Sequence, residues 1–144
     1  MSNRSQAIIV EQSFNKPKEE VWSAITDPDR MRKWFFENIP GFIPEVGFET
    51  RFNVDAGERQ FMHLWRITEV IPFEKIVYNW KYENIEGNAL VSFELFEQNP
   101  KTLLRLTNLR LETFPPNIPE FSRESCIGGW HYFIKQRLKN YLDS

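Results

Sequence analysis

The C-terminal stretch from Ser122 to Leu142 constrains the fold most, because it has the pattern of one long amphipathic helix. Its apolar residues recur at helical spacing, and polar residues lie between them on the other side. The apolar residues are Trp130, Phe133, Ile134, Leu138 and Tyr141, and the polar ones are Lys135, Gln136, Lys139 and Asn140. The apolar face must be covered, and only the strand-rich region before the helix is large enough to cover it. We therefore expect a sheet that wraps around this helix and leaves a pocket between them.

The N-terminal third predicts one strand followed by two short helices. Ala7 to Phe14 alternates weakly and is rich in β-branched residues, which is typical of a strand. Asn15 or Lys16 then begins a helix, which Thr26-Asp27-Pro28 ends. A second short helix is expected from Pro28 to Phe35.

Five further strands are expected in antiparallel succession, because short stretches rich in turn-forming residues separate alternating apolar runs. These strands are Phe48 to Val54, Phe61 to Ile71, Lys75 to Tyr82, Ala89 to Glu97 and Thr102 to Leu111. Val91, Phe93 and Leu95 share one face of their strand, so we expect one packed and one solvated face. A proline-rich linker, Pro115 to Pro119, then leads to Ser122, the expected helix N-cap.

Length and composition narrow the class of protein. A chain of 144 residues predicts a single domain, residues 1–144, that buries a core without disulfides or metal. The formal net charge of −2 argues against nucleic-acid partners, which need a basic surface. The single cysteine, Cys126, makes no internal disulfide, and the first residues are polar with no signal-peptide core. We expect a cytoplasmic protein, and the lack of an apolar run near 18 residues predicts no integral membrane association.

In the order of its elements and in several motifs, the chain resembles the helix-grip fold of the START/Bet v 1-like (SRPBCC) superfamily. More narrowly, it resembles the family named for the C-terminal domain of the activator of Hsp90 ATPase, from about Ala7 to Leu142. The matching segments are Val21-Trp22-Ile25-Pro28 running on to Trp34, Trp65 to Pro72 followed by Lys75 to Trp80, and the closing Gly128-Gly129-Trp130 helix. The resemblance implies an α+β fold in which a curved antiparallel sheet of about six strands grips the C-terminal helix over an apolar cavity. Trp65 stands where the family more often has glycine, which bears on the volume of that cavity.

Aromatic side chains are the main candidates for the cavity wall. Aromatic residues make up 15% of the chain, and large rings either fill a core or line an apolar pocket. The candidates are Trp34, Phe35, Trp65, Tyr78, Trp80, Phe93, Trp130 and Phe133. Gly128 and Gly129 favour close packing of their helix against a neighbouring element, or alternatively an open mouth beside the pocket.

Three polar residues are candidates for contact with a ligand. His63 lies on the same side of its strand as Phe61, and it would bind a ligand, act as an acid or base, or remain a structural histidine. Arg66 is a candidate anchor if it faces inward, where its charge would need a partner. Asn108 shares a face with the apolar Leu106, so it either completes a hydrogen-bond network or points at a ligand.

Metal and nucleophilic chemistry have little support in the sequence. Cys126 lies before the apolar helix face and fits a small core residue better than a partner of His63 or His131. The two histidines have no ligand spacing, so no metal and no cofactor are expected.

Three functions remain after this reading of the sequence. The favoured one is non-catalytic binding of a small hydrophobic molecule, a lipid or an aromatic metabolite, in a cavity of several hundred cubic ångströms. The second is a co-chaperone-like protein-interaction module related to the Hsp90 ATPase activator, and the third is a cyclase or hydrolase that uses a pocket histidine or carboxylate. The sequence leaves open whether the protein is a monomer or a homodimer, and whether a chaperone or another protein is its partner.

Overall fold

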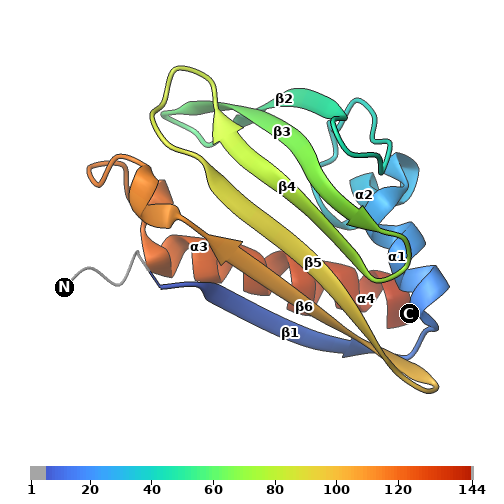
Figure 1. Ribbon diagram of the computed structural model, residues 1–144. Helices are drawn as coiled ribbons and strands as arrows, with labels where there is room; N and C mark the ends of the chain where they lie inside the picture. Colours follow the sequence, from blue (N-terminus) through green and yellow to red (C-terminus); the bar gives the residue numbers. More distant parts are fainter. Residues whose placement is uncertain (1–5, 144) are drawn as a thin grey trace.

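A six-stranded antiparallel sheet curves around a long C-terminal helix in the computed structural model, which describes residues 6–143 (Figure 1). The strands are β1 (Ile8–Phe14), β2 (Glu49–Asp55), β3 (Gln60–Ile71), β4 (Lys75–Tyr82), β5 (Ala89–Gln98) and β6 (Lys101–Leu109). Their order in the sheet is β1-β6-β5-β4-β3-β2, so only β1 pairs with a strand distant in sequence. The expected helix-grip architecture is confirmed. The polar start of the chain, residues 1–5, lies outside the described residues.

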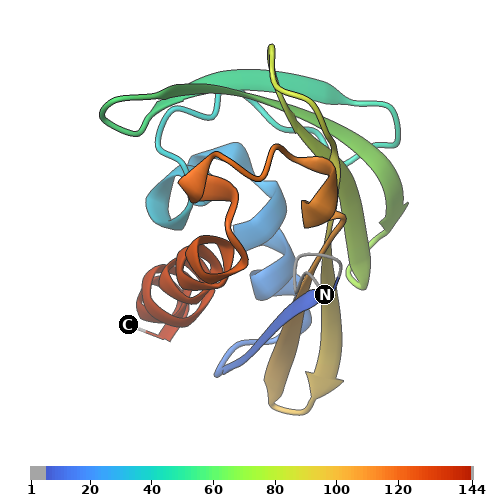
Figure 2. The same ribbon diagram turned by 90° about the vertical axis from the view of Figure 1, so that its left-hand side faces the viewer.

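The concave face of the sheet carries the core. Along β5 and β6, alternate residues are buried, as the period of two in the sequence predicts. The register places Phe93 opposite Leu106 and Val91 opposite Asn108, so the buried residues form rows across the strands. Figure 2 shows the sheet bending around the helices, which all lie on this concave side.

Two short helices, α1 (Lys18–Thr26) and α2 (Pro28–Trp34), connect β1 to β2. The side chain of Asp27 caps α2 by accepting a hydrogen bond from the backbone N–H of Asp29, and Pro28 occupies the first helical position. The indole N–H of Trp34 donates to the carbonyl oxygen of Ala24 at 2.8 Å. This buried bond fixes α2 against α1.

The C-terminal helix is continuous but not regular. It consists of α3 (Arg123–Trp130), the π-helical segment η4 (His131–Leu138) and α4 (Lys139–Asp143), where the sequence predicted one regular helix. Ser122 is the N-cap as expected, because its hydroxyl accepts from the backbone N–H of Ser125. The buried residues of the helix fall at every fourth position, and they are Trp130, Ile134, Leu138 and Leu142. Phe133 and Tyr141 of the predicted apolar face are only partly buried.

The segment between β6 and α3 is more structured than a stiff linker. β6 ends at Leu109, two residues before the predicted end, because Arg110 has a φ of 69° and turns the chain into the 3₁₀ helix η2 (Leu111–Thr113). A second 3₁₀ helix, η3 (Pro119–Phe121), precedes α3. The segment thereby places the apolar side chains of Leu111, Phe114 and Phe121 over one end of the sheet.

Among the helices of residues 6–143, none has the length and apolar character that a membrane span requires.

Candidate functional site

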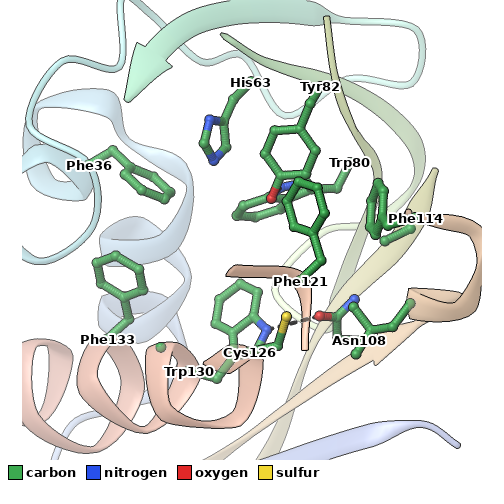
Figure 3. A pocket seen from close by; sticks show the side chains of 13 residues that line it. Phe36, His63, Trp80, Tyr82, Asn108, Phe114, Phe121, Cys126, Trp130 and Phe133 are labelled. Carbon is green, nitrogen blue, oxygen red and sulfur yellow. Dashed lines mark hydrogen bonds between the residues drawn. The ribbon is translucent and has the colours of Figure 1, made fainter. Parts of the chain in front are cut away.

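A cavity of about 150 Å³ lies between the concave face of the sheet and the C-terminal helix (Figure 3). It is lined by Phe36, His63, Trp80, Tyr82, Ala89, Asn108, Leu111, Phe114, Phe121, Cys126, Gly129, Trp130 and Phe133. Its volume is below the several hundred cubic ångströms expected from the sequence, so that expectation is wrong. The space suits a molecule of about one ring, because an apolar cavity of similar size in another protein holds benzene.

The predicted site residues separate into three groups. Five line the cavity: His63, Trp80, Asn108, Trp130 and Phe133. Five lie in the packed core beside it: Trp34, Phe35, Trp65, Tyr78 and Phe93. The eleventh, Arg66, lies on the outside of the sheet.

The aromatic residues of the core reduce the volume of the cavity. The ring of Phe35 stacks on Trp34 at 4.6 Å, contacts Phe133 edge-on at 4.9 Å and stacks on Trp65 at 5.4 Å. Trp65 is only 2% exposed, so its ring occupies the interior where a glycine would have left space. These rings therefore act as core residues, and the cavity is confined to the end of the sheet near η2 and η3.

Arg66 corrects one prediction. Side chains alternate along β3, with His63, Trp65 and Ile67 buried on the concave face, so the intervening Arg66 is exposed on the convex face. A side chain on that face does not reach the cavity. The prediction of Arg66 as a ligand anchor is therefore wrong.

His63 is a buried, neutral histidine at the cavity wall. Its Nδ1 lies 3.0 Å from the carbonyl oxygen of Phe61, which only accepts, so Nδ1 carries the proton. Burial lowers the pKa of His63 to about 4. Its Nε2 is therefore a lone-pair acceptor at neutral pH, and it makes no hydrogen bond within residues 6–143.

Tyr82 supplies a hydroxyl group in the same wall. The hydroxyl oxygen accepts a hydrogen bond of 2.8 Å from the indole N–H of Trp80. Burial raises the pKa of Tyr82 far above its usual range, so the hydroxyl keeps its proton. Within the described part of the chain that proton has no acceptor, which leaves Tyr82 able to donate to a bound molecule.

Asn108 is the third polar group of the wall, and it lies on β6. Its Oδ1 accepts a 3.1 Å hydrogen bond from the indole N–H of Trp130, the dashed line in Figure 3. Because an indole N–H only donates, this bond fixes which end of the amide is oxygen. The Nδ2 group of Asn108 is buried and has no hydrogen-bond partner in the described part of the chain.

The two glycines of α3, Gly128 and Gly129, do not serve the close helix packing that the sequence favoured. A Cβ atom built on Gly128 or Gly129 would meet nothing within 4 Å, so the prediction of close packing at these positions is wrong. Gly129 lines the cavity, which agrees with the alternative of an opening beside the pocket. The close approach occurs instead at Gly87, where a Cβ would lie 2.6 Å from the carbonyl carbon of Thr113.

Several lining residues were missed by the sequence reasoning. Phe114 and Phe121 come from the segment between β6 and α3, and Phe36 follows α2. The sequence signal for Phe114 and Phe121 was their position on either side of the proline-rich linker.

Cys126, expected as a core residue, is half-buried and lines the cavity. Among residues 6–143, no three His, Cys, Asp or Glu side chains gather into a group that could hold a metal ion.

Comparisons with known proteins agree with this fold. The family model described as activator of Hsp90 ATPase homolog 1-like protein matches residues 15–143. A structure from Chromobacterium violaceum has a TM-score of 0.79 at 20% identity, covering 96% of this chain and 97% of that one. A structure from Rhizobium loti has a TM-score of 0.80 at 17% identity, with coverages of 95% and 96%. The Aha1 dimer of Colwellia psychrerythraea has a TM-score of 0.74 at 19% identity, and 96% of each chain is covered. At identities of 17–20%, these structures show a shared fold and not a shared function. A search of curated protein sequences found no match.

Proposed function

Because the chain belongs to the family of activator of Hsp90 ATPase homologue 1-like proteins, and because it holds an aromatic cavity between sheet and helix, we propose that it binds a small hydrophobic molecule there without transforming it. The family supports either a ligand-binding or a co-chaperone-like domain. The chemistry of the cavity wall favours the first.

The unpaired amide of Asn108 is the observation that carries this proposal. Asn108 is 5% exposed, and its Nδ2 has no hydrogen-bond partner among residues 6–143. An unsatisfied buried donor costs about 1–3 kcal/mol, and of the three buried polar atoms without a partner in residues 6–143 only this one belongs to a residue of the cavity wall. A polar atom of a ligand that reaches this nitrogen would satisfy it.

The rest of the lining fits a hydrophobic ligand. Most of the wall is aromatic or aliphatic, and within residues 6–143 no Asp, Glu, Lys or Arg lines it. Sites for small molecules usually combine such an apolar wall with a few polar groups that fix orientation.

Native mass spectrometry of the protein purified from its own host tests the proposal. We expect an extra mass that recurs between preparations and disappears on denaturation. Thermal shift with single-ring compounds and with lipids supplies the second readout, because a ligand that binds only the folded state raises Tm. A clean protein mass together with no shift for any compound would overturn the proposal.

A co-chaperone-like role is the second candidate, and the description of the matching family is the observation that favours it. Its test is the ATPase rate of an Hsp90-type chaperone from the same host, measured with and without the protein. A rate that rises with protein concentration and saturates supports this role. An unchanged rate, together with failure to capture the chaperone, would remove it.

An acid–base enzyme has less support. A general base works best when its pKa lies near the operating pH, whereas burial lowers the pKa of His63 to about 4. No carboxylate lines the cavity within residues 6–143 to act in its place.

A further inference from the structure

We propose that the ligand of this cavity is an uncharged single-ring molecule with a hydroxyl group, and that His63 and Tyr82 together recognise that hydroxyl. This inference rests on the proposed function and specifies the chemistry of its ligand.

His63 and Tyr82 form a pair across two strands. They are direct partners in the antiparallel register of β3 and β4, and their rings meet edge-on with centroids 4.8 Å apart. Both line the cavity, and Figure 3 shows the two side chains next to each other in its wall. A single group on a ligand can therefore contact both.

The two residues offer complementary hydrogen-bonding groups. The Nε2 atom of neutral His63 only accepts, because Nδ1 holds the proton and donates to the carbonyl of Phe61. The hydroxyl oxygen of Tyr82 already accepts from Trp80, so its proton is the group that remains to donate. A ligand hydroxyl satisfies both, since it donates to His63 and accepts from Tyr82. A carbonyl or ether would satisfy only Tyr82, and an N–H group would satisfy only His63.

The ligand must also be uncharged. No Asp, Glu, Lys or Arg of residues 6–143 lines the cavity, so a carboxylate, phosphate or ammonium group among its aromatic rings would have no opposite charge beside it, and burying an unpaired ion is very unfavourable. His63 does not supply a positive charge, because burial keeps its imidazole neutral near pH 7.

The walls and the volume indicate a ring. The rings of Trp80 and Trp130 meet edge-on at 5.6 Å, and Phe36 and Phe133 meet at 5.1 Å, so aromatic side chains form much of the wall. Aromatic pairs favour such edge-to-face and offset arrangements, and a planar ligand ring can make them with these walls. The volume of about 150 Å³ matches a single ring, because an apolar cavity of similar size holds benzene.

The test compares four probes that share a toluene ring and differ in the group at the para position: toluene, p-cresol, 4-methylanisole and p-toluate. Their affinities for the unaltered full chain are measured by calorimetry or by NMR titration at neutral pH. We expect p-cresol to bind about tenfold more tightly than toluene, because it alone offers a hydroxyl to both residues. 4-Methylanisole, which only accepts, and p-toluate, which is charged, should bind more weakly than p-cresol.

Two variants assign the preference to this pair of residues. Tyr82→Phe and His63→Phe should each remove the roughly tenfold preference for p-cresol over toluene, read as the ratio of the two affinities in the same variant. Tyr78→Phe is the matched control, because Tyr78 is a second tyrosine on β4 that is buried and does not line the cavity. It should leave the affinities for both probes unchanged. If a variant does not fold, the probe series on the unaltered protein still decides.

The outcomes separate this inference from the function on which it rests. Toluene binding as tightly as p-cresol would overturn the hydroxyl preference and leave hydrophobic binding in place. A p-cresol preference that survives both substitutions would overturn the assignment to His63 and Tyr82. Failure of all four probes to bind, with no endogenous ligand in the mass spectrum, would remove the proposed function and this inference with it.

Discussion

The indole N–H of Trp130 donates a 3.1 Å hydrogen bond to Oδ1 of Asn108, joining the C-terminal helix to the concave face of the sheet. The bond leaves the Nδ2 group of the same amide buried and, among residues 6–143, without a partner. A contact that orders the helix on the sheet thus also orients a donor that no described residue accepts from.

The coupling between Trp130 and Asn108 is measurable. Asn108→Leu leaves the indole N–H of Trp130 without its acceptor, and Trp130→Phe leaves Oδ1 of Asn108 without its donor. The double variant should lose about 1 kcal/mol less than the sum of the two single losses. Urea unfolding of the four proteins measures this coupling energy. Strict additivity would mean that the bond contributes nothing to stability.

The two tyrosines of β4 should respond in opposite directions when their hydroxyl group is removed. The hydroxyl of Tyr78 is buried and has no partner within residues 6–143, so Tyr78→Phe should raise the free energy of unfolding by about 1 kcal/mol. Tyr82→Phe should lower it by about 1 kcal/mol, because the indole N–H of Trp80 loses its acceptor. Denaturant unfolding of both variants checks the signs, and equal signs would contradict this account of the two hydroxyls.

His63 makes stability depend on pH. Burial lowers the pKa of its folded state to about 4, whereas the unfolded chain takes up the proton near 6.5. The unfolded state therefore binds more protons in this window. The free energy of unfolding should be unaffected by His63 above about pH 6.5 and fall by about 3 kcal/mol as the pH drops to about 4.

The measurement is the difference in unfolding free energy between the unaltered protein and His63→Phe, taken from about pH 7 to pH 4. This difference isolates His63 from the carboxylates that also titrate on acidification. His131→Gln is the control, since His131 is exposed on the C-terminal helix, and it should retain the full dependence. A pH profile that His63→Phe leaves unchanged would refute the prediction.

Gly87 fixes the β4–β5 connection against η2. Its φ is 106°, and a Cβ there would lie 2.8 Å from the ring of Phe114, a residue of the cavity wall. The neighbouring Asn88 is held by its backbone N–H, which donates to the hydroxyl of Thr113 at 2.9 Å. Gly87→Ala should therefore destabilise the protein by about 2–3 kcal/mol, combining backbone strain with a steric clash.

Gly57→Ala is the matched control for this substitution. Gly57 also has a positive φ, 88°, but a Cβ there would meet nothing within 4 Å. It should cost only the backbone strain, about 1 kcal/mol. Thermal unfolding of both variants separates the two contributions, and equal losses would show that the contact at Gly87 is unimportant.

Substitutions at Gly129 and Gly128 test whether ligands enter the cavity beside α3. Gly129→Leu should place a side chain in the cavity opening and abolish binding of single-ring compounds, whereas Gly128→Leu should not, because Gly128 does not line the cavity. Both substitutions replace glycine in a helix, so each should gain up to about 1 kcal/mol of helix propensity. Titration with toluene reads out the difference. Binding that persists in Gly129→Leu would place the ligand elsewhere.

Local patterns in the sequence determined the fold. The period of two along residues such as Val91 and Phe93 is a property of each strand, and Ser122 caps the last helix through a contact within one turn. The outward position of Arg66 was also readable, since it lies between the inward-facing Trp65 and Ile67 on β3. The alternation along β3 therefore excludes Arg66 from the concave face.

Only the tertiary structure decided the site. Phe35 and Phe36 are neighbours after α2, yet Phe35 lies in the core among Trp34 and Trp65, while Phe36 lines the cavity. The sequence determined that large aromatic residues face the interior, because the period of each strand or helix places its apolar residues on one face, and that face is buried. How much space they leave depends on side chains from the sheet, two helices and a loop meeting at one place, and no local pattern contains that packing.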